Sequence, residues 1–451
     1  MKKTFIVTIA ALLILTSINL NAQVEFNKSK LDEFLHQIEK NNKAMCGIVI
    51  LNNGKLVYEN YIGFSSIENE THNHYLTKFR IGSITKIFTA IIIFQLIEEG
   101  RLALDTKLSE FYPQITNSID ICIAAMLGHR SGIQSFTDDP EYPNYMTSKK
   151  SKEEMLKLIS NLEPDFRPDE KYAYSNSNYV LLGYIIEEMT NSTYEQQLKQ
   201  RITEKLNLTN TAYGNKIDTQ ADDANSYRYQ ENRWNIQPET DMSIPHGAGA
   251  IISTPNDLVT FISSLFGDKL ITDGSLIQMK EINNGYGKGL IRFPFGNRAA
   301  YGHNGVIDGF VSLLAFFPDD NVALSVLANG MNYNFNDMLI GILSIYFDIP
   351  FEIPNFEAKE IEMGTEELTK YAGEFSSKQL PLKISLKTEG IQLYGQATGQ
   401  SAFPLTPYSK TEFRFEPAGI VIEFKKNSSG KIRYDLFILN QGGEKFTYER
   451  Q

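Results

Sequence analysis

The chain has 451 residues, of which 42% are hydrophobic and 12% aromatic, so it can bury a large core, and its length indicates two domains. Its 54 acidic and 43 basic side chains give a net charge of −11 at pH 7, which argues against nucleic acid and anionic membrane surfaces as partners. Two cysteines, Cys46 and Cys122, lie among apolar neighbours, so free buried thiols are favoured over the one disulfide that they could form.

The N-terminus has the features of an export signal. Lys2 and Lys3 precede an apolar stretch at residues 5–15, and a short polar segment ends at Ala22. We therefore expect residues 1–22 to be a cleaved signal peptide and the mature protein to be periplasmic or secreted, with no transmembrane segment. An uncleaved N-terminal anchor is the alternative, although the apolar stretch is short for a membrane span.

The first elements after the signal are predicted to be a hairpin and a buried helix. The β-rich runs at residues 47–51 and 55–61 flank residues 52–54, in which Asn-Gly is a strong turn signal. A helix then begins near Ser83 and ends before Gly100, because its apolar residues recur at helical spacing up to that glycine.

The middle of the chain favours helices, and strands return after it. The expected helices are residues 151–161, 179–190, 194–205, 256–265 and 336–346, and the expected strands are residues 311–317 and 322–328. This order predicts an α+β domain over residues 23–346, with an antiparallel sheet covered by helices and a helical subdomain.

The C-terminal part of the chain is predicted to be a separate small domain. Residues 347–358 combine prolines with acidic residues and lack a helical period, so they are predicted to form a linker. Residues 359–451 then contain short alternating runs separated by glycines, which is typical of an all-β barrel or sandwich. The clearest of these runs are residues 382–386, 391–394, 421–424 and 434–437.

The chemistry-bearing residues begin with Ser83 and Lys86. One helical turn separates positions i and i+3, so the lysine amine can lie beside the serine hydroxyl while the Ser83 N–H stays free near the helix N-terminus. These are the parts that acyl transfer requires. A serine that merely caps the helix, followed by a solvated lysine, is the alternative. Two further motifs, at residues 174–176 and 303–305, favour the catalytic interpretation.

Together these motifs resemble those of the serine β-lactamase and penicillin-binding DD-peptidase superfamily, and most closely its class C, D-aminopeptidase and esterase-like branch. The likeness covers residues 26–346 and implies a β-lactamase/transpeptidase-like fold there, followed more loosely by a lipocalin-like domain. The matching stretches are FRIGSITK at 79–86, MLGHRSGI at 126–133, YSNSNYVLLG at 174–183, GAGAIIST at 247–254 and GHNG at 302–305.

The resemblance implies a role for each residue of the first two motifs. Ser83 is the nucleophile that forms an acyl-enzyme, Lys86 keeps its hydroxyl primed, and Tyr174 passes the proton to the leaving group. Lysine can act as a base only if its pKa is lowered, and a phenol with an ordinary pKa near 10 works only beside positive charge. Asn176 is implied to orient the lysine and to bind the substrate carbonyl, although Asn176 or Ser177 could instead cap the next helix.

The third motif departs from the common lactamase pattern, which has lysine where this chain has His303. The resemblance implies that His303 borders the pocket and hydrogen-bonds the substrate or Tyr174, while a histidine that ends a strand is the alternative. Gly305 lets the strand approach a ligand closely, and the N–H of Val306 is implied to join that of Ser83 in an oxyanion hole. Because histidine is mostly neutral at pH 7, this difference favours peptidase or esterase activity over β-lactam hydrolysis.

The predicted function is therefore an exported serine hydrolase that acylates Ser83 with a small peptide, amide or ester, including cell-wall fragments, as D-alanyl-D-alanine carboxypeptidases, D-aminopeptidases or esterases do. A class C-like β-lactamase and a non-catalytic protein that senses β-lactams or cell wall are the alternatives. No cofactor or metal is expected, because His72 and His74 lack a third ligand at zinc-site spacing. By family likeness, His129 is expected to be structural.

Overall fold

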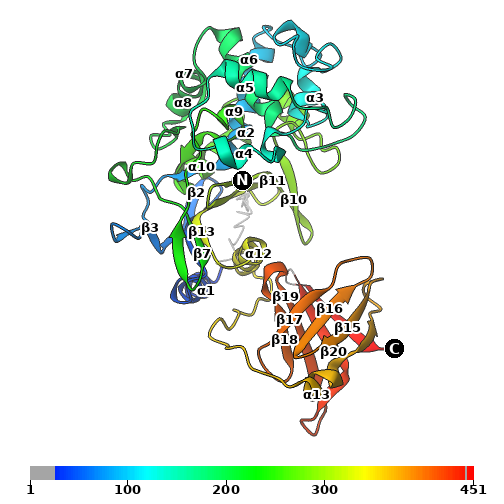
Figure 1. The fold of residues 1–451 in the computed structure, drawn as a ribbon. Helices are drawn as coiled ribbons and strands as arrows, with labels where there is room; N and C mark the ends of the chain where they lie inside the picture. The colour runs from blue at the N-terminus through cyan, green and yellow to red at the C-terminus, as the bar shows by residue number, and fades with distance from the viewer. Residues whose placement is uncertain (1–25, 442–443) are drawn as a thin grey trace, which may run out of the picture.

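The protein is described here by a computed structural model that covers residues 26–441 and 444–451. The predicted signal peptide, residues 1–22, lies outside the described residues. Figure 1 shows a larger body, in which helices cover a sheet, and a smaller β-barrel that follows it in the chain. Within the described part of the chain, each helix is too short or too polar to cross a membrane.

The larger body is built on one sheet. Its strands are β1 (Ala44–Asn52), β2 (Lys55–Ile62), β7 (Tyr227–Gln230), β8 (Arg233–Ile236), β10 (Ile291–Phe295), β11 (Arg298–Ile307), β12 (Phe310–Phe317) and β13 (Val322–Met331). The antiparallel order is β10-β11-β12-β13-β1-β2, and the β7–β8 hairpin joins β13 by a short parallel pairing. The predicted hairpin is confirmed: β1 and β2 pair across Asn53 and Gly54, both with positive φ, as a tight hairpin turn requires.

Helices cover both faces of this sheet. The helices α1 (Lys28–Lys40) and α12 (Phe335–Tyr346) lie on one face, and α2 (Thr85–Glu98) and α10 (Pro255–Leu265) lie on the other. Successive residues of β1 alternate between the two cores: Ile48 and Ile50 pack toward α1, and Val49 packs toward the face covered by α10. The α+β prediction is thus confirmed as a helix–sheet–helix sandwich.

The helical subdomain lies between the early strands and the rest of the sheet in sequence. Its helices are α3 (Ile123–Leu127), α4 (Tyr142–Tyr145), α5 (Lys152–Ser160), α6 (Asn176–Thr190), α7 (Tyr194–Leu198), α8 (Glu204–Leu206), α9 (His246–Gly249) and α11 (Asp273–Met279), with 3-10 turns η2 (Leu108–Glu110) and η3 (Phe136–Asp138). The helix predicted from residue 179 starts earlier, at Asn176. The one predicted at 194–205 is broken by a π-helical turn, η4 (Lys199–Thr203).

A small sheet leads into the region of Ser83. It has the order β5 (Phe79–Arg80), β9 (Ile251–Ser253), β6 (Ala212–Tyr213), and the 3-10 turn η1 (Gly82–Ile84) follows β5 directly. A separate pair, β3 (Phe64–Ser66) with β4 (Thr71–His72), lies outside this region. The buried Arg80 guanidinium bonds Asp308 and Glu239, both at 2.8 Å, so the strand that enters η1 is anchored by its side chain as well as its backbone.

The C-terminal domain is a closed antiparallel barrel. After α13 (Thr365–Leu368), its strands are β14 (Gly373–Ser376), β15 (Lys383–Glu389), β16 (Gln392–Ala397), β17 (Phe403–Pro407), β18 (Glu412–Phe415), β19 (Ile420–Lys426), β20 (Ile432–Gln441) and β21 (Glu444–Arg450). Buried rings such as Phe375, Phe424 and Phe437 fill its interior. The prediction of a small all-β domain is confirmed, and the barrel is the correct alternative. The exact domain limits and the 347–358 linker stay predictions.

Candidate active site

Ser83, Lys86 and Tyr174 meet at one hydroxyl group. Ser83 lies on η1, and Lys86 lies one turn later on α2. The Lys86 Nζ atom is 3.0 Å from Ser83 Oγ, and the Tyr174 hydroxyl donates a hydrogen bond to the same Oγ at 2.7 Å. Ser83 therefore does not act as a helix cap, because its side chain is engaged by the lysine and the phenol.

The Lys86 amine is completely buried and is held by three oxygen atoms. Besides Ser83 Oγ, the amine contacts Asn176 Oδ1 and the Ala248 carbonyl, each at 2.8 Å. No carboxylate of the described residues forms an ion pair with it, and burial lowers the pKa of Lys86 well below its usual value. In this arrangement the amine donates to all three oxygens. Loss of its proton, which burial favours, leaves two N–H groups for the amide and carbonyl oxygens and one lone pair for the Ser83 hydroxyl, and this is the form that can act as a base.

Asn176 is the first residue of α6 and faces the lysine. Its Oδ1 accepts from Lys86, its Nδ2 donates to Thr137 Oγ1 at 3.0 Å, and its backbone N–H donates to Ser135 Oγ at 3.0 Å. The cap position of α6 belongs to Ser175, which makes no side-chain capping bond. The alternative that Asn176 caps the helix is therefore wrong, because its amide is used on both sides of the site.

Tyr174 keeps its proton in this arrangement. Burial raises the pKa of the Tyr174 phenol above its usual value, and the hydrogen bond to Ser83 opposes this shift only in part. The Lys86 Nζ atom lies 4.9 Å from the centre of the phenol ring. The phenol is therefore a hydrogen-bond donor to Ser83 in the resting site, and it is close enough to the lysine to exchange a proton with it through the serine oxygen.

His129 holds the segment that carries Tyr174. The imidazole Nδ1 accepts from the Ser175 N–H at 3.0 Å, and the His129 carbonyl accepts from the Ala173 N–H at 3.1 Å. The His129 ring lies 4.3 Å from the Tyr174 ring, centre to centre. Burial first, and then the neighbouring Lys86, lower the pKa of His129 well below its usual value. The expected structural role thus has a definite form: a neutral imidazole fixes Tyr174 from both sides.

His303 is buried on β11, but its partner differs from the expected one. Its Nδ1 lies 2.5 Å from the Asn304 carbonyl, to which it can only donate, so Nε2 accepts from the Tyr286 hydroxyl at 3.0 Å. Of the two expected partners, Tyr174 is not bonded, since the two rings are 6.3 Å apart and both His303 nitrogens are already used, and a hydrogen bond to the substrate stays a prediction. Burial and then Lys86 lower the pKa of His303 to about 3, so the ring is neutral.

Two contributors were not identified from the sequence. Tyr286 comes from a glycine-containing loop, residues 285–289, whose local pattern shows no sign of a site. The Ala248 carbonyl belongs to the GAGAIIST stretch that carries the family resemblance, so the motif marked the segment without showing that a main-chain oxygen in it binds Lys86.

The edge of β11 runs against the backbone of η1. A Cβ atom placed on Gly305 would lie 2.1 Å from the Ile81 carbonyl oxygen and 3.0 Å from Ser83 N, and one placed on Gly82 would lie 3.0 Å from Val306 N. Only glycine at position 305 permits this approach. The main-chain nitrogens of Ser83 and Val306 are thereby brought to the same junction, as an oxyanion hole formed by these two groups requires.

The histidines and cysteines of the described residues have other surroundings than those of a metal site. Over residues 26–441 and 444–451, no group of three or more His, Cys, Asp or Glu side chains could hold a metal ion. His74 instead lies 3.3 Å from Asp222, and His72 stacks on Phe64. Both cysteines are free, as predicted, with Cys46 buried and Cys122 half-buried.

Comparison with known proteins places the chain in a family. The model of the beta-lactamase family matches residues 36–342, which is more than half of the chain. The chain belongs to this family. The resemblance to serine β-lactamases and penicillin-binding DD-peptidases is thus confirmed at the level of the family.

Relatives of this family share the fold over different parts of the chain. Protein flp of Staphylococcus aureus (strain N315) is 27% identical over 323 residues, which are 67% of this chain but only 63% of that protein. The D-amino acid amidase of Ochrobactrum anthropi SV3 is 22% identical with a TM-score of 0.62, covering 71% of this chain and 99% of its own. The octameric penicillin-binding protein homologue of Pyrococcus abyssi, 23% identical with a TM-score of 0.65, covers 94% of this chain and 99% of its own.

Gly305→Ala tests the junction between β11 and η1. The added methyl group cannot fit against the Ile81 carbonyl, so β11 must move and displace the Val306 N–H. We expect kcat for ester or amide hydrolysis to fall by about a hundredfold or more, as it does when an oxyanion donor is lost. Gly274→Ala is the matched control, because a Cβ there meets nothing closer than 3.8 Å. Equal kcat for the two variants would contradict this assignment.

Proposed function

We propose that this chain is an exported serine hydrolase that acylates Ser83 with a small amide, peptide or ester and then transfers the acyl group to water. The observation that carries the proposal is the single hydroxyl group contacted by a buried lysine at 3.0 Å and by a phenol at 2.7 Å. Export rests on the signal-like pattern of residues 1–22.

In the proposed reaction Lys86 and Tyr174 transfer protons during acylation and again, in reverse, during deacylation. Ser83 Oγ attacks the substrate carbonyl while Lys86 Nζ takes the hydroxyl proton, which makes the amine an ammonium group. The N–H groups of Ser83 and Val306 bind the oxyanion of the tetrahedral intermediate. Tyr174 gives its proton to the leaving nitrogen or oxygen and is reprotonated from Lys86. Water then attacks the acyl-enzyme, and the same proton carriers return Ser83 to its starting state.

The chemistry of the pocket supports neutral amides and esters as the preferred substrates. His303 occupies the position where lysine is common in lactamases, yet it is neutral and has both nitrogens engaged by Tyr286 and Asn304. Lys86 is completely buried and burial lowers its pKa, so neither residue presents an exposed positive charge to a substrate carboxylate. Val306, with 64% of its surface exposed, adds an apolar patch beside the site. Neighbours described as a D-amino acid amidase and a D-stereospecific amidohydrolase agree with this preference.

Ser83→Ala tests the nucleophile. We expect the wild-type protein to be labelled covalently by a fluorescent fluorophosphonate and the Ser83→Ala variant to remain unlabelled, because Ser83 carries the one hydroxyl that hydrogen-bonds Lys86 among the described residues. The adduct is located by mass spectrometry of peptides, and Ser160→Ala, which changes a helix-surface serine that bonds the Lys157 carbonyl, serves as the control. Labelling that survives in Ser83→Ala would remove Ser83 from this role.

A comparison of paired substrates tests the preference for uncharged leaving groups. We expect kcat/KM for a D-amino acid amide or ester to exceed that for the matched dipeptide with a free carboxylate by about tenfold or more, the equivalent of about 1.4 kcal/mol. Initial rates at neutral pH measure this ratio. A ratio of one or below would favour a carboxypeptidase, and rapid turnover of nitrocefin would favour a β-lactamase.

A further inference from the structure

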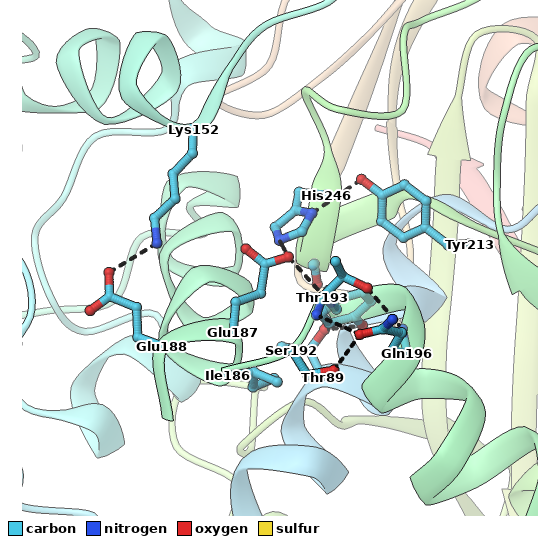
Figure 2. Close-up of polar contacts among 12 residues, drawn as sticks. Thr89, Lys152, Ile186, Glu187, Glu188, Ser192, Thr193, Gln196, Tyr213 and His246 are labelled. Atoms are coloured by element: carbon cyan, nitrogen blue, oxygen red, sulfur yellow. Dashed lines mark hydrogen bonds and ion pairs between the residues drawn. The ribbon is translucent and has the colours of Figure 1, made fainter. Parts of the chain in front are cut away.

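A second buried polar cluster lies beside the segment that binds Lys86. It consists of Thr89 on α2, Glu187 on α6, Tyr194 on α7, Tyr213 on β6 and His246 on α9, and we call it the His246 cluster. Figure 2 shows His246 at its centre, between Tyr213 and Glu187. No part of the proposed reaction uses any of these side chains.

The short helix α9 needs support from outside itself. It contains only the four residues His-Gly-Ala-Gly, and both its length and its two glycines make such a helix unfavourable in isolation. His246 also has a φ of 35°, in the left-handed region that non-glycine residues rarely adopt. Nevertheless, α9 presents the Ala248 carbonyl that accepts a hydrogen bond from Lys86 at 2.8 Å. Contacts of the His246 side chain are therefore the natural source of the missing stability.

The His246 ring is held at its Nδ1 edge and on its face. It stacks on Tyr184, with ring centres 4.7 Å apart. The Tyr213 hydroxyl donates its one proton to the Met242 carbonyl at 2.8 Å, so His246 Nδ1, 3.1 Å from the same oxygen, must be the donor of their bond. Nε2 makes no hydrogen bond to the described residues and lies 3.9 Å from Glu187 Oε1. The proton of the neutral ring is therefore on Nδ1, because Tyr213 can only accept from it.

Close contact between α9 and α6 ties the two acceptors of Lys86 together. A Cβ on Gly183 would lie 2.7 Å from His246 Cδ2, and a Cβ on Gly247 would lie 2.6 Å from the Tyr179 carbonyl. The two backbones therefore touch at this pair of glycines. Since α6 begins with Asn176, the amide oxygen and the carbonyl oxygen that hold the lysine belong to one packed unit.

A hydrogen-bonded chain links the cluster to the helix that carries Lys86. The Thr89 hydroxyl, one turn after Lys86, donates to the Gly247 carbonyl at 2.6 Å. Because its proton is used there, Thr89 accepts from the Tyr194 hydroxyl at 2.6 Å. The Tyr194 N–H in turn donates to Glu187 at 2.9 Å. Through these bonds α9 is connected to α2 by its main chain and to the His246 cluster by its side chains.

We propose that His246 is a positioning residue for Lys86: its ring holds α9 in place, so that the Ala248 carbonyl binds one N–H of the lysine and directs the lone pair toward Ser83. This inference rests on the proposed function of Ser83 and Lys86. Burial and then Lys152 lower the pKa of His246 to about 3, so the ring is neutral and adds no charge of its own beside the lysine.

Two substitutions at His246 separate the hydrogen bond from general stability. His246→Phe keeps an aromatic ring but loses the donor to Tyr213, and we expect the first-order rate of Ser83 acylation by a fluorophosphonate to fall about ten- to hundredfold. His246→Asn retains a donor at the δ position and tolerates positive φ, so its rate should stay within about threefold of the wild type. Tyr213→Phe removes the acceptor of the same bond and should act like His246→Phe, which keeps the test open if His246→Phe fails to fold.

The pH dependence of the acylation rate distinguishes a positioning role of His246 from a general loss of stability. Acylation requires unprotonated Lys86, so its rate rises with pH through the pKa of that amine. When α9 loosens and water enters, the pKa of Lys86 rises toward its ordinary value, and the rising limb in His246→Phe moves to higher pH. The other histidines near the amine, His129 and His303, are buried and neutral and do not account for such a shift.

Tyr112→Phe is the matched control, since it removes a tyrosine hydroxyl that bonds Glu188, next to Glu187 in sequence, and that makes no hydrogen bond to α9 in the described part of the chain. The proposal predicts that Tyr112→Phe is acylated at the wild-type rate. It also predicts faster amide hydrogen exchange at Ala250, whose N–H donates to the His246 carbonyl, in His246→Phe and Tyr213→Phe but not in Tyr112→Phe. Unchanged acylation in a His246→Phe protein with loosened α9 would overturn the inference and leave the proposed function intact. A wild-type protein that is not acylated would overturn both.

Discussion

The burial of one amine is the constraint on which the rest of this structure depends. Lys86 has no exposed surface and no carboxylate partner among the described residues, so its charged form is strongly disfavoured. Its three contacts are an amide oxygen, a carbonyl oxygen and the Ser83 hydroxyl. Burial favours the neutral form of this amine, and a neutral amine beside a serine is a base beside a nucleophile.

The surrounding elements can be understood as means of keeping this arrangement. The α6 helix supplies Asn176, α9 supplies the Ala248 carbonyl, and the strand edge of β11 closes against η1 because Gly305 has no side chain. Where α9 meets α6 and where β11 meets η1, the backbones approach more closely than any residue but glycine permits. The neutral state of His129 and His303 follows from the same enclosure, because burial disfavours a charged imidazole as it disfavours a charged amine.

The parts of the site that are local in sequence could be predicted, and those that depend on tertiary partners could not. The contact of Ser83 with Lys86 follows from helical spacing, and the β1–β2 hairpin follows from its Asn-Gly turn. The partner of His303 could not be predicted, because Tyr286 arrives from a loop without a distinctive pattern. The α1 helix was missed although Leu31, Leu35 and Ile38 recur at helical spacing, so a signal for it was present.

The protonation state of Lys86 is the most direct test of this account. The full chain, ¹³C-enriched at lysine Cε, would be titrated by NMR from neutral pH to beyond the ordinary lysine pKa of about 10.4, with the Lys86 signal assigned from its absence in Lys86→Arg. The account predicts that this one signal already has the shift of a neutral amine at pH 7, while the exposed lysines titrate normally. A Lys86 signal that titrates together with the other lysines would contradict it.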